Sequence, residues 1–268
     1  MRLYRNLKLQ TLAIALLFVV VSLVAMQFFA TGPVLLVTAS LAVVGINWRL
    51  YRALHHQFGE QLNQYRQLEA LTGLYNTLDI RHPLPRMRDF AASPDFLHLL
   101  ATEIFRIQPK LIVETGSGTS TLIAAYCLRK IGQGRIVSLD HLEIYADQTR
   151  QTIESHGLEN FARVLHAPLR NYTLDDQAYR WYDDGELHPL DRIDLLIIDG
   201  PPKDVSPSAR YPAVPLLRDK LHTDTVVLLD DGRRPAEKRI VVLWKERYGL
   251  NYSSRPTEKG AFVCSFDR

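Results

Sequence analysis

Apolar and polar residues alternate in two different ways along this chain, and the change comes near residue 80. Thr11 to Ala30 contain no charged residue, and a second apolar run, Val34 to Ile46, follows the turn residues Thr31-Gly32-Pro33. A helix of about 20 residues rises about 30 Å, which matches the hydrocarbon core of a bilayer. The pattern predicts a transmembrane helical hairpin within residues 1–50, with the lipid bilayer as its partner.

Positive residues flank the predicted hairpin on both sides. Arg2, Arg5 and Lys8 precede it, and Arg49 follows it. The positive-inside rule then places both ends of the hairpin in the cytoplasm. We therefore expect a protein of the inner, cytoplasmic membrane whose remaining chain is cytoplasmic. A cleaved signal peptide is disfavoured because Phe28 stands where a small residue is needed and because cleavage leaves the second run unexplained.

Residues 51–84 read as a helical neck followed by a linker. Apolar side chains recur there at steps of three or four, at Leu54, Phe58, Leu62, Tyr65, Leu68 and Leu71. Such a stripe predicts one buried helix face. Either the neck forms a short coiled coil and a homo-oligomer through residues 51–75, or it packs against the domain that follows.

From residue 85 to residue 268, short apolar runs alternate with amphipathic segments. The runs predict strands at 111–114, 135–139, 161–166, 193–198 and 225–229, with helices at 94–107, 142–156 and 235–248 between them. Continuous apolar strands that alternate with helices predict an α/β domain, a parallel sheet with helices on both faces. Ligands of such sheets bind at the carboxyl ends of the strands.

Composition excludes several other classes of protein. The net charge is +3 and the basic residues form no long run, so nucleic acid is not expected as a partner. Cys127 and Cys264 both lie in apolar runs, and no CxxC pair occurs. This arrangement indicates buried thiols rather than a disulfide framework or a zinc site.

The stretch Leu111 to Leu122, LIVETGSGTSTL, combines a buried strand, a tight turn and the start of a helix. Gly116 and Gly118 allow the backbone to approach a ligand closely, and the helix start directs N–H groups at it. Glu114 adds an acceptor at the strand end. Thr121 stands where the dinucleotide fingerprint requires its third glycine, which disfavours NAD and FAD.

Acids end several of the other predicted strands. Asp140 follows the second strand, 26 residues after Glu114, where a carboxylate accepts both ribose hydroxyls of a nucleoside or caps the next helix. Asp199 follows the strand at 193–198, and Asp230 and Asp231 follow the strand at 225–229. All of these acids are predicted to gather at one edge of the sheet.

Six segments resemble one bacterial group of class I S-adenosylmethionine (SAM)-dependent methyltransferases: AASPDFL (91–97), VETGSGTST (113–121), SLDH (138–141), IDLLIIDGPP (193–202), ARYPA (209–213) and LLDDGRR (228–234). The resemblance implies a Rossmann-like seven-stranded methyltransferase sheet whose last strand, near 261–265, is antiparallel. It also implies a SAM site made by Glu114, Thr115, Gly116, Ser117, Gly118, Ser120, Asp140, His141, Ala167 and Asp199. His141 and Ala167 are expected to lie beside the adenine.

Asp199, Asp230 and Asp231 are more distantly similar to the magnesium ligands of the catechol O-methyltransferase type, in which a nearby lysine, here Lys203, takes the hydroxyl proton. Asp231 departs from that pattern because it replaces an asparagine. Three interpretations remain. In one, the three acids are ligands of Mg²⁺. Alternatively, the neighbouring like charges raise the pKa of a carboxylate, so that Asp199 or Asp230 acts as the general base, or the segment is a plain turn whose charge Arg233 or Arg234 neutralises.

The acceptor is expected to be a hydroxyl of a small molecule, a sugar or a lipid-linked compound. Its pocket is predicted from segments 170–189 and 203–211, where Tyr179, Trp181 and Tyr182 either line it or pack, and where Arg210 and Tyr211 either orient the acceptor or fix the loop. Two alternatives remain: a catalytically silent, membrane-tethered scaffold that keeps the nucleoside pocket, and an NAD-dependent oxidoreductase.

Overall fold

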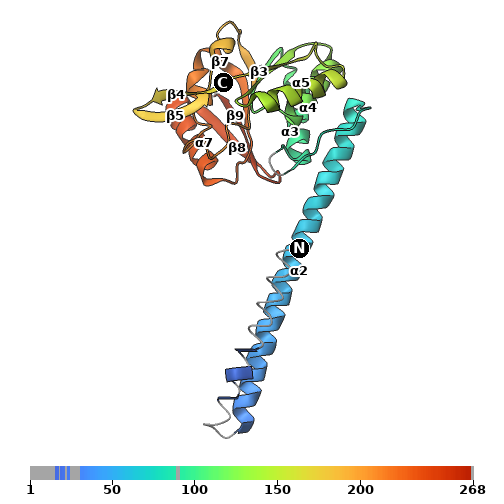
Figure 1. Cartoon of the computed structure of the whole chain (residues 1–268), viewed down its shortest axis with the longest axis vertical. Helices are drawn as coiled ribbons and strands as arrows, with labels where there is room; N and C mark the ends of the chain where they lie inside the picture. Colours follow the sequence, from blue (N-terminus) through green and yellow to red (C-terminus); the bar gives the residue numbers. More distant parts are fainter. Residues whose placement is uncertain (1–15, 18, 22, 25–30, 89–90, 267–268) are drawn as a thin grey trace. The chain divides into compact units, whose positions relative to one another are not determined.

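A computed structural model describes residues 16–17, 19–21, 23–24, 31–88 and 91–266 (Figure 1). The chain divides into two compact units, Met1–Gln64 and Tyr65–Arg268. Each unit is described by itself below.

The first unit is dominated by helix α2, Thr31–Leu78, which runs for 48 residues and continues into the second unit. The second arm of the predicted hairpin and the neck are therefore one continuous helix rather than separate elements. Most of the first arm, Thr11 to Ala30, lies outside the described residues. Across the described ranges, no helix combines the length and the apolar character needed to cross a membrane.

The last turns of α2, from Tyr65 onward, belong to the second unit and pack into it. Leu74 and Leu78 are buried in its core, and Gln67 Oε1 accepts a hydrogen bond from Asp95 N at 3.1 Å. Of the two alternatives for the neck, packing against the following domain is confirmed for these turns.

A seven-stranded sheet forms the centre of the second unit, with strand order β3-β2-β1-β6-β7-β9-β8. Five strands are parallel: β1 (Leu111–Thr115), β2 (Arg135–Asp140), β3 (Ala162–His166), β6 (Ile193–Ile198) and β7 (Leu221–Leu229). Strand β9 (Ala261–Phe266) is antiparallel to both β7 and β8 (Leu250–Arg255). The predicted sheet and its antiparallel last strand are confirmed.

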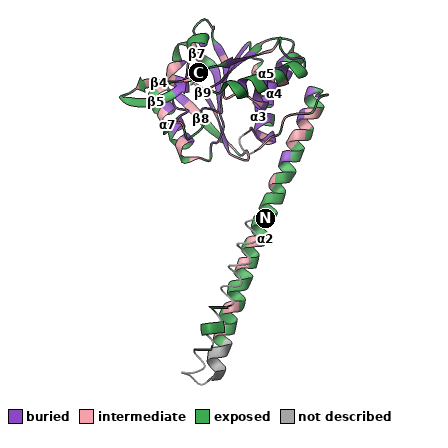
Figure 2. Ribbon diagram, in the orientation of Figure 1, coloured by how far each residue is buried: buried purple, intermediate pink, exposed green. Residues whose placement is uncertain are grey.

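Helices cover both faces of this sheet, so two apolar cores form (Figure 2). Neighbouring residues of β1 face opposite sides, with Ile112 in one core and Val113 in the other. The helices are α3 (Pro94–Ile107), α4 (Thr119–Ile131), α5 (Glu143–Ser155), the short α6 (Ala213–Leu216) and α7 (Pro235–Tyr248), with 3-10 turns η1 (Gly185–Leu187) and η2 (Arg218–Lys220).

An antiparallel hairpin, β4 (Leu169–Leu174) and β5 (Gln177–Tyr182), occupies the segment between β3 and β6 (Figure 1). The sequence analysis assigned no secondary structure there. Asp175 and Asp176 form its tip with φ of 50° and 61°, a conformation that aspartate tolerates in tight hairpin turns. Tyr211 Oη donates to Asp175 Oδ2 at 2.9 Å and ties the tip to the core.

Candidate active site

The glycine loop follows β1 and lies against the end of β6. Gly116 has a φ of 95°, and a Cβ placed on it would lie 3.1 Å from Gly200 N, so glycine is required where the two loops meet. Thr115 Oγ1 donates to Gly200 O at 3.1 Å and holds the loops together. A Cβ on Gly118 would meet no atom within 4 Å, so this part of the loop borders open space.

Glu114 is fully buried beneath the loop. Its Oε2 accepts hydrogen bonds from Thr121 Oγ1 and Ser138 Oγ, while Thr121 Oγ1 also accepts from Gly118 N at 3.0 Å. Burial raises the pKa of Glu114 to about 7, although hydrogen bonds from Ser120, Thr121 and Ser138 oppose that shift. Glu114 thus organises the loop, and only its Oε1, which has no partner among the described residues, remains for a ligand.

Asp140 ends β2 directly beside the glycine loop, as predicted. Its Oδ2 accepts from Ser117 N at 3.3 Å and from Ser117 Oγ at 2.8 Å. Its Oδ1 accepts from Leu142 N at 3.1 Å, which is the bond expected of a residue that caps the turn into α5. The capping interpretation of Asp140 is therefore supported, and the ribose interpretation stays a prediction.

His141 and Ala167 lie beside Asp140 at the same edge of the sheet. Ala167 N donates to Asp140 O at 2.7 Å, and the His141 ring meets the Tyr182 ring edge-on at 6.1 Å. Burial lowers the pKa of His141 more than neighbouring Asp140 raises it, so the imidazole is neutral near pH 7. Neutral, partly apolar walls at this position are suited to a nucleobase.

Tyr182 reaches from the end of β5 into the space between the glycine loop and Asp199. Its side chain is buried, and a Cβ on Gly200 would collide with its hydroxyl. Burial, followed by the charges of Asp140, Asp199 and Glu114, raises the pKa of Tyr182 well above its usual value. The hydroxyl therefore stays protonated, and it makes no hydrogen bond within the described part of the chain.

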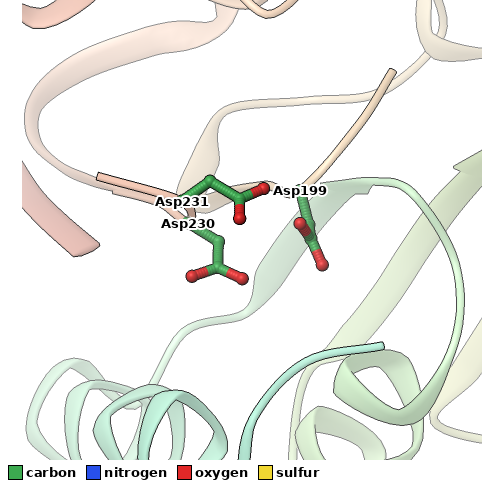
Figure 3. A group of neighbouring side chains, drawn as sticks. All are labelled: Asp199, Asp230 and Asp231. Atoms are coloured by element: carbon green, nitrogen blue, oxygen red, sulfur yellow. The ribbon is translucent and has the colours of Figure 1, made fainter. Parts of the chain in front are cut away.

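Asp199, Asp230 and Asp231 converge from the ends of β6 and β7 (Figure 3). One oxygen of each lies within 4.8 Å of the others. Asp230 is fully buried, and neither of its carboxylate oxygens has a partner among the described residues. Burial, then the charges of Asp199 and Asp231, raises the pKa of Asp230 well above its usual value.

Arg210 is the residue that the sequence analysis did not place in this cluster. Its Nη2 donates to Asp199 Oδ1 at 3.1 Å and to Asp231 Oδ2 at 2.7 Å. The same guanidinium donates to the backbone oxygens of Asp199 and Asp230. Arg234 forms an ion pair with Asp231 at 2.8 Å, which agrees with the interpretation that Arg233 or Arg234 neutralises the turn after β7. Arg210 is nevertheless the more buried partner of Asp231.

A divalent cation and Arg210 would share this arrangement of donors. Three carboxylates are suitable ligands for Mg²⁺. Two of them already accept hydrogen bonds from Arg210 through one oxygen each, and the guanidinium is buried and held by two backbone oxygens as well. Arg210 therefore supplies positive charge to the cluster, and the Mg²⁺ site stays a prediction.

The remaining predicted site residues lie in different environments. Lys203 is exposed in the loop after β6, and within the described ranges it forms no ion pair with the aspartates, so its role as base stays a prediction. Lys259 was missed: its charge lowers the pKa of both Asp199 and Asp230 against the larger effect of burial. Trp181 and Tyr211 are core residues, since both are fully buried.

Comparison with known proteins identifies a matching family model and solved structures of the same fold. Residues 113–232 match a family model described as a methyltransferase domain. The SAH-bound methyltransferase PaMTH1 of Podospora anserina has 15% identity and a TM-score of 0.58, covering 79% of this chain and 96% of its own. An O-methyltransferase of Bacillus cereus in complex with SAH has 18% identity and a TM-score of 0.52, covering 77% and 97%.

A third structure, the SAM-bound O-methyltransferase TomG of Streptomyces achromogenes, has 15% identity and a TM-score of 0.53, covering 78% of this chain and 96% of its own. The search of curated proteins gave no match. The family match over residues 113–232 shows that this chain contains a methyltransferase domain, and the sheet order and the comparisons support a SAM-dependent methyltransferase of the class I fold.

Proposed function

We propose that this enzyme transfers the methyl group of SAM to a hydroxyl oxygen. The nucleoside end of SAM would lie over Asp140, His141 and Ala167, and its methyl group would point toward Asp199 and Asp230. The place of Asp140 beside the glycine loop, and of Asp199 and Asp230 at the ends of β6 and β7, supports this orientation. The O-methyltransferases among the structural neighbours support a hydroxyl as the acceptor.

The observation that carries this proposal is the buried, unpartnered carboxylate of Asp230. SAM is already an activated donor, so the enzyme must position the acceptor and remove its proton. In the proposed step the acceptor oxygen attacks the methyl carbon, the bond from carbon to sulfur breaks, and the proton passes to Asp230. Arg210 bonds to Asp199 and Asp231, so Asp230 is the carboxylate whose two oxygens accept no hydrogen bond within the described residues.

The acceptor can be found with isotope-labelled SAM. We expect membrane extracts incubated with the enzyme and methyl-labelled SAM to yield a compound that gains one labelled methyl group on oxygen, detected by mass spectrometry. Wild-type enzyme and an Asp230→Asn variant are compared in parallel. A label that appears on nitrogen or carbon would contradict the proposed hydroxyl acceptor.

Tyr182→Phe should weaken SAM binding by about 3- to 10-fold, because a buried hydrogen bond contributes about 0.5–1.5 kcal/mol. The reason is that the Tyr182 hydroxyl lies beside Gly200, next to the glycine loop, and makes no hydrogen bond within the described residues. Calorimetric titration with SAM measures the effect. Tyr179→Phe is the matched control, since its hydroxyl bonds to Gln177 on the same hairpin; equal affinity in both variants would exclude a cofactor contact for Tyr182.

Chelation should leave the methyl-transfer rate unchanged. Arg210 already supplies positive charge to Asp199 and Asp231, so we propose that no divalent cation is required. Turnover is measured after dialysis against EDTA and again after Mg²⁺ is added. Loss of activity in EDTA with recovery in Mg²⁺ would restore the metal interpretation.

We further propose that the uncharged segment 11–30 attaches the enzyme to the cytoplasmic membrane, where a lipid-linked or glycan acceptor is accessible. The absence of charge over 20 residues supports this. Protease that is added to the cytoplasmic face of sealed vesicles should cleave the catalytic domain. Protection of that domain would contradict the proposed orientation.

We also propose self-association through the neck. The exposed side chains of Leu54, Phe58 and Leu62 support it, and sedimentation analysis can measure it.

A further inference from the structure

A polar cavity of about 310 Å³ lies in the catalytic unit away from the candidate active site. Helix α4 begins at the glycine loop with Thr119 and ends at Ile131, and the cavity adjoins its last turns. The cavity is therefore at the opposite end of the sheet from the carboxyl ends of the strands. Every lining residue is polar or titratable: Asp79, Arg81, His82, Tyr126, Arg129 and His156.

The floor of the cavity is rigid and buried. Tyr126 Oη and His156 Nδ1 share a hydrogen bond of 2.6 Å, and both side chains are buried. The Arg129 guanidinium carbon lies 4.6 Å from the centre of the Tyr126 ring, a cation–π distance. This contact holds the Arg129 side chain at the cavity that it lines.

The rim of the cavity comes from the segment that follows α2. Arg81 pairs with Asp79 at 3.0 Å, and both side chains are exposed. The His82 ring lies 5.3 Å from the His156 ring. Burial, followed by the proximity of His82, lowers the pKa of His156, so the His156 imidazole favours its neutral form.

We propose that this cavity binds a phosphate group. Two guanidiniums and a single carboxylate line the cavity, which leaves an excess of positive charge among the lining residues. Guanidiniums match phosphate oxygens as paired donors, and the neighbouring imidazole rings can add N–H donors. The phosphate belongs either to a soluble phosphate monoester or to a lipid headgroup, which share this chemistry.

Titration of the full-length protein with inorganic phosphate tests the proposal. We expect saturable shifts of the His82 and His156 side-chain resonances in NMR spectra. The double variant Arg81→Ala/Arg129→Ala should bind phosphate at least tenfold more weakly, a difference of about 1.4 kcal/mol. Arg163→Ala is the matched control, because Arg163 is also an exposed arginine in a surface ion pair, with Glu186; it should bind like the wild type.

Vesicle flotation distinguishes the two sources of phosphate. Phosphatidylcholine vesicles with and without phosphatidic acid are compared for the wild type and the double variant, which share the same N-terminal segment. A gain from phosphatidic acid that the double variant loses would assign a lipid headgroup, and phosphate binding without that gain would assign a soluble ligand. Equal phosphate affinity in the wild type and the double variant would overturn the proposal.

Discussion

Arg210→Met is expected to abolish methyl transfer and to lower the free energy of unfolding by about 3–5 kcal/mol, the usual effect of breaking a buried ion pair. The variant leaves the half-buried Asp199 and the buried Asp231 without their shared guanidinium. It also removes the donors of two backbone oxygens. Urea unfolding followed by circular dichroism measures the loss of stability.

Arg234→Met is the control for this experiment. Arg234 pairs with the same carboxylate, Asp231, but its side chain is partly exposed. Exposed ion pairs contribute about 0–1 kcal/mol, so this variant should keep most of its stability. Similar losses in both variants would show that Arg210 has no special place in the cluster.

Asp230→Asn should lower the turnover number by about 10²- to 10⁴-fold, the range expected when a general base is removed. SAM affinity should stay nearly the same, because Asp230 lies at the acceptor side of the proposed site. Asn has nearly the same shape, and the carboxylate it replaces makes no hydrogen bond among the described residues. Steady-state rates together with SAM titration separate the two effects; an equal loss in both would reassign Asp230 to cofactor binding.

The same variant should change how stability depends on pH. The raised pKa of Asp230 means that the folded protein binds a proton more tightly than the unfolded chain does. Its contribution is therefore fully present below the unfolded pKa and is lost as pH rises toward the folded pKa. Glu114, with its pKa raised to about 7, acts in the same direction. Wild-type stability should fall from pH 4 upward, and Asp230→Asn should fall less steeply; identical slopes would contradict the raised pKa.

The sheet and the strand-end acids were predictable because local signals specify them. The apolar run before Gly116 predicts a buried parallel strand, and the acids Asp140, Asp199 and Asp230 follow three other such runs. Since parallel strands share a carboxyl edge, their final acids had to meet there. The distances between these acids and the burial of each side chain, by contrast, could be seen only in the folded chain.

Arg210 and the β4–β5 hairpin were not predicted because their signals are weaker. Arg210 lies in the connection from β6 to β7, separated in sequence from both acids with which it pairs. Only folding brings its side chain to them. The hairpin has alternating polar and apolar residues around Asp175-Asp176, a turn signal that was available but was read as an irregular pocket segment. The continuity of α2 from Thr31 to Leu78 was not predicted, because the change from apolar to amphipathic residues near residue 50 does not show whether a helix ends there.

A silent scaffold and an NAD-dependent oxidoreductase were the other candidate functions. A scaffold has no use for Asp230, whose burial without a partner opposes folding. An oxidoreductase is disfavoured by Thr121, which serves here as the partner of Glu114 and Gly118.

Calorimetric titration of the wild type and Asp140→Ala with SAM and with NAD tests the central claim most directly. That claim is that the glycine loop and Asp140 form a site for a sulfonium nucleoside. We expect one SAM per chain, no binding of NAD, and SAM binding weakened by about 1–3 kcal/mol in Asp140→Ala at unchanged thermal stability. Tight binding of NAD without binding of SAM would contradict the account.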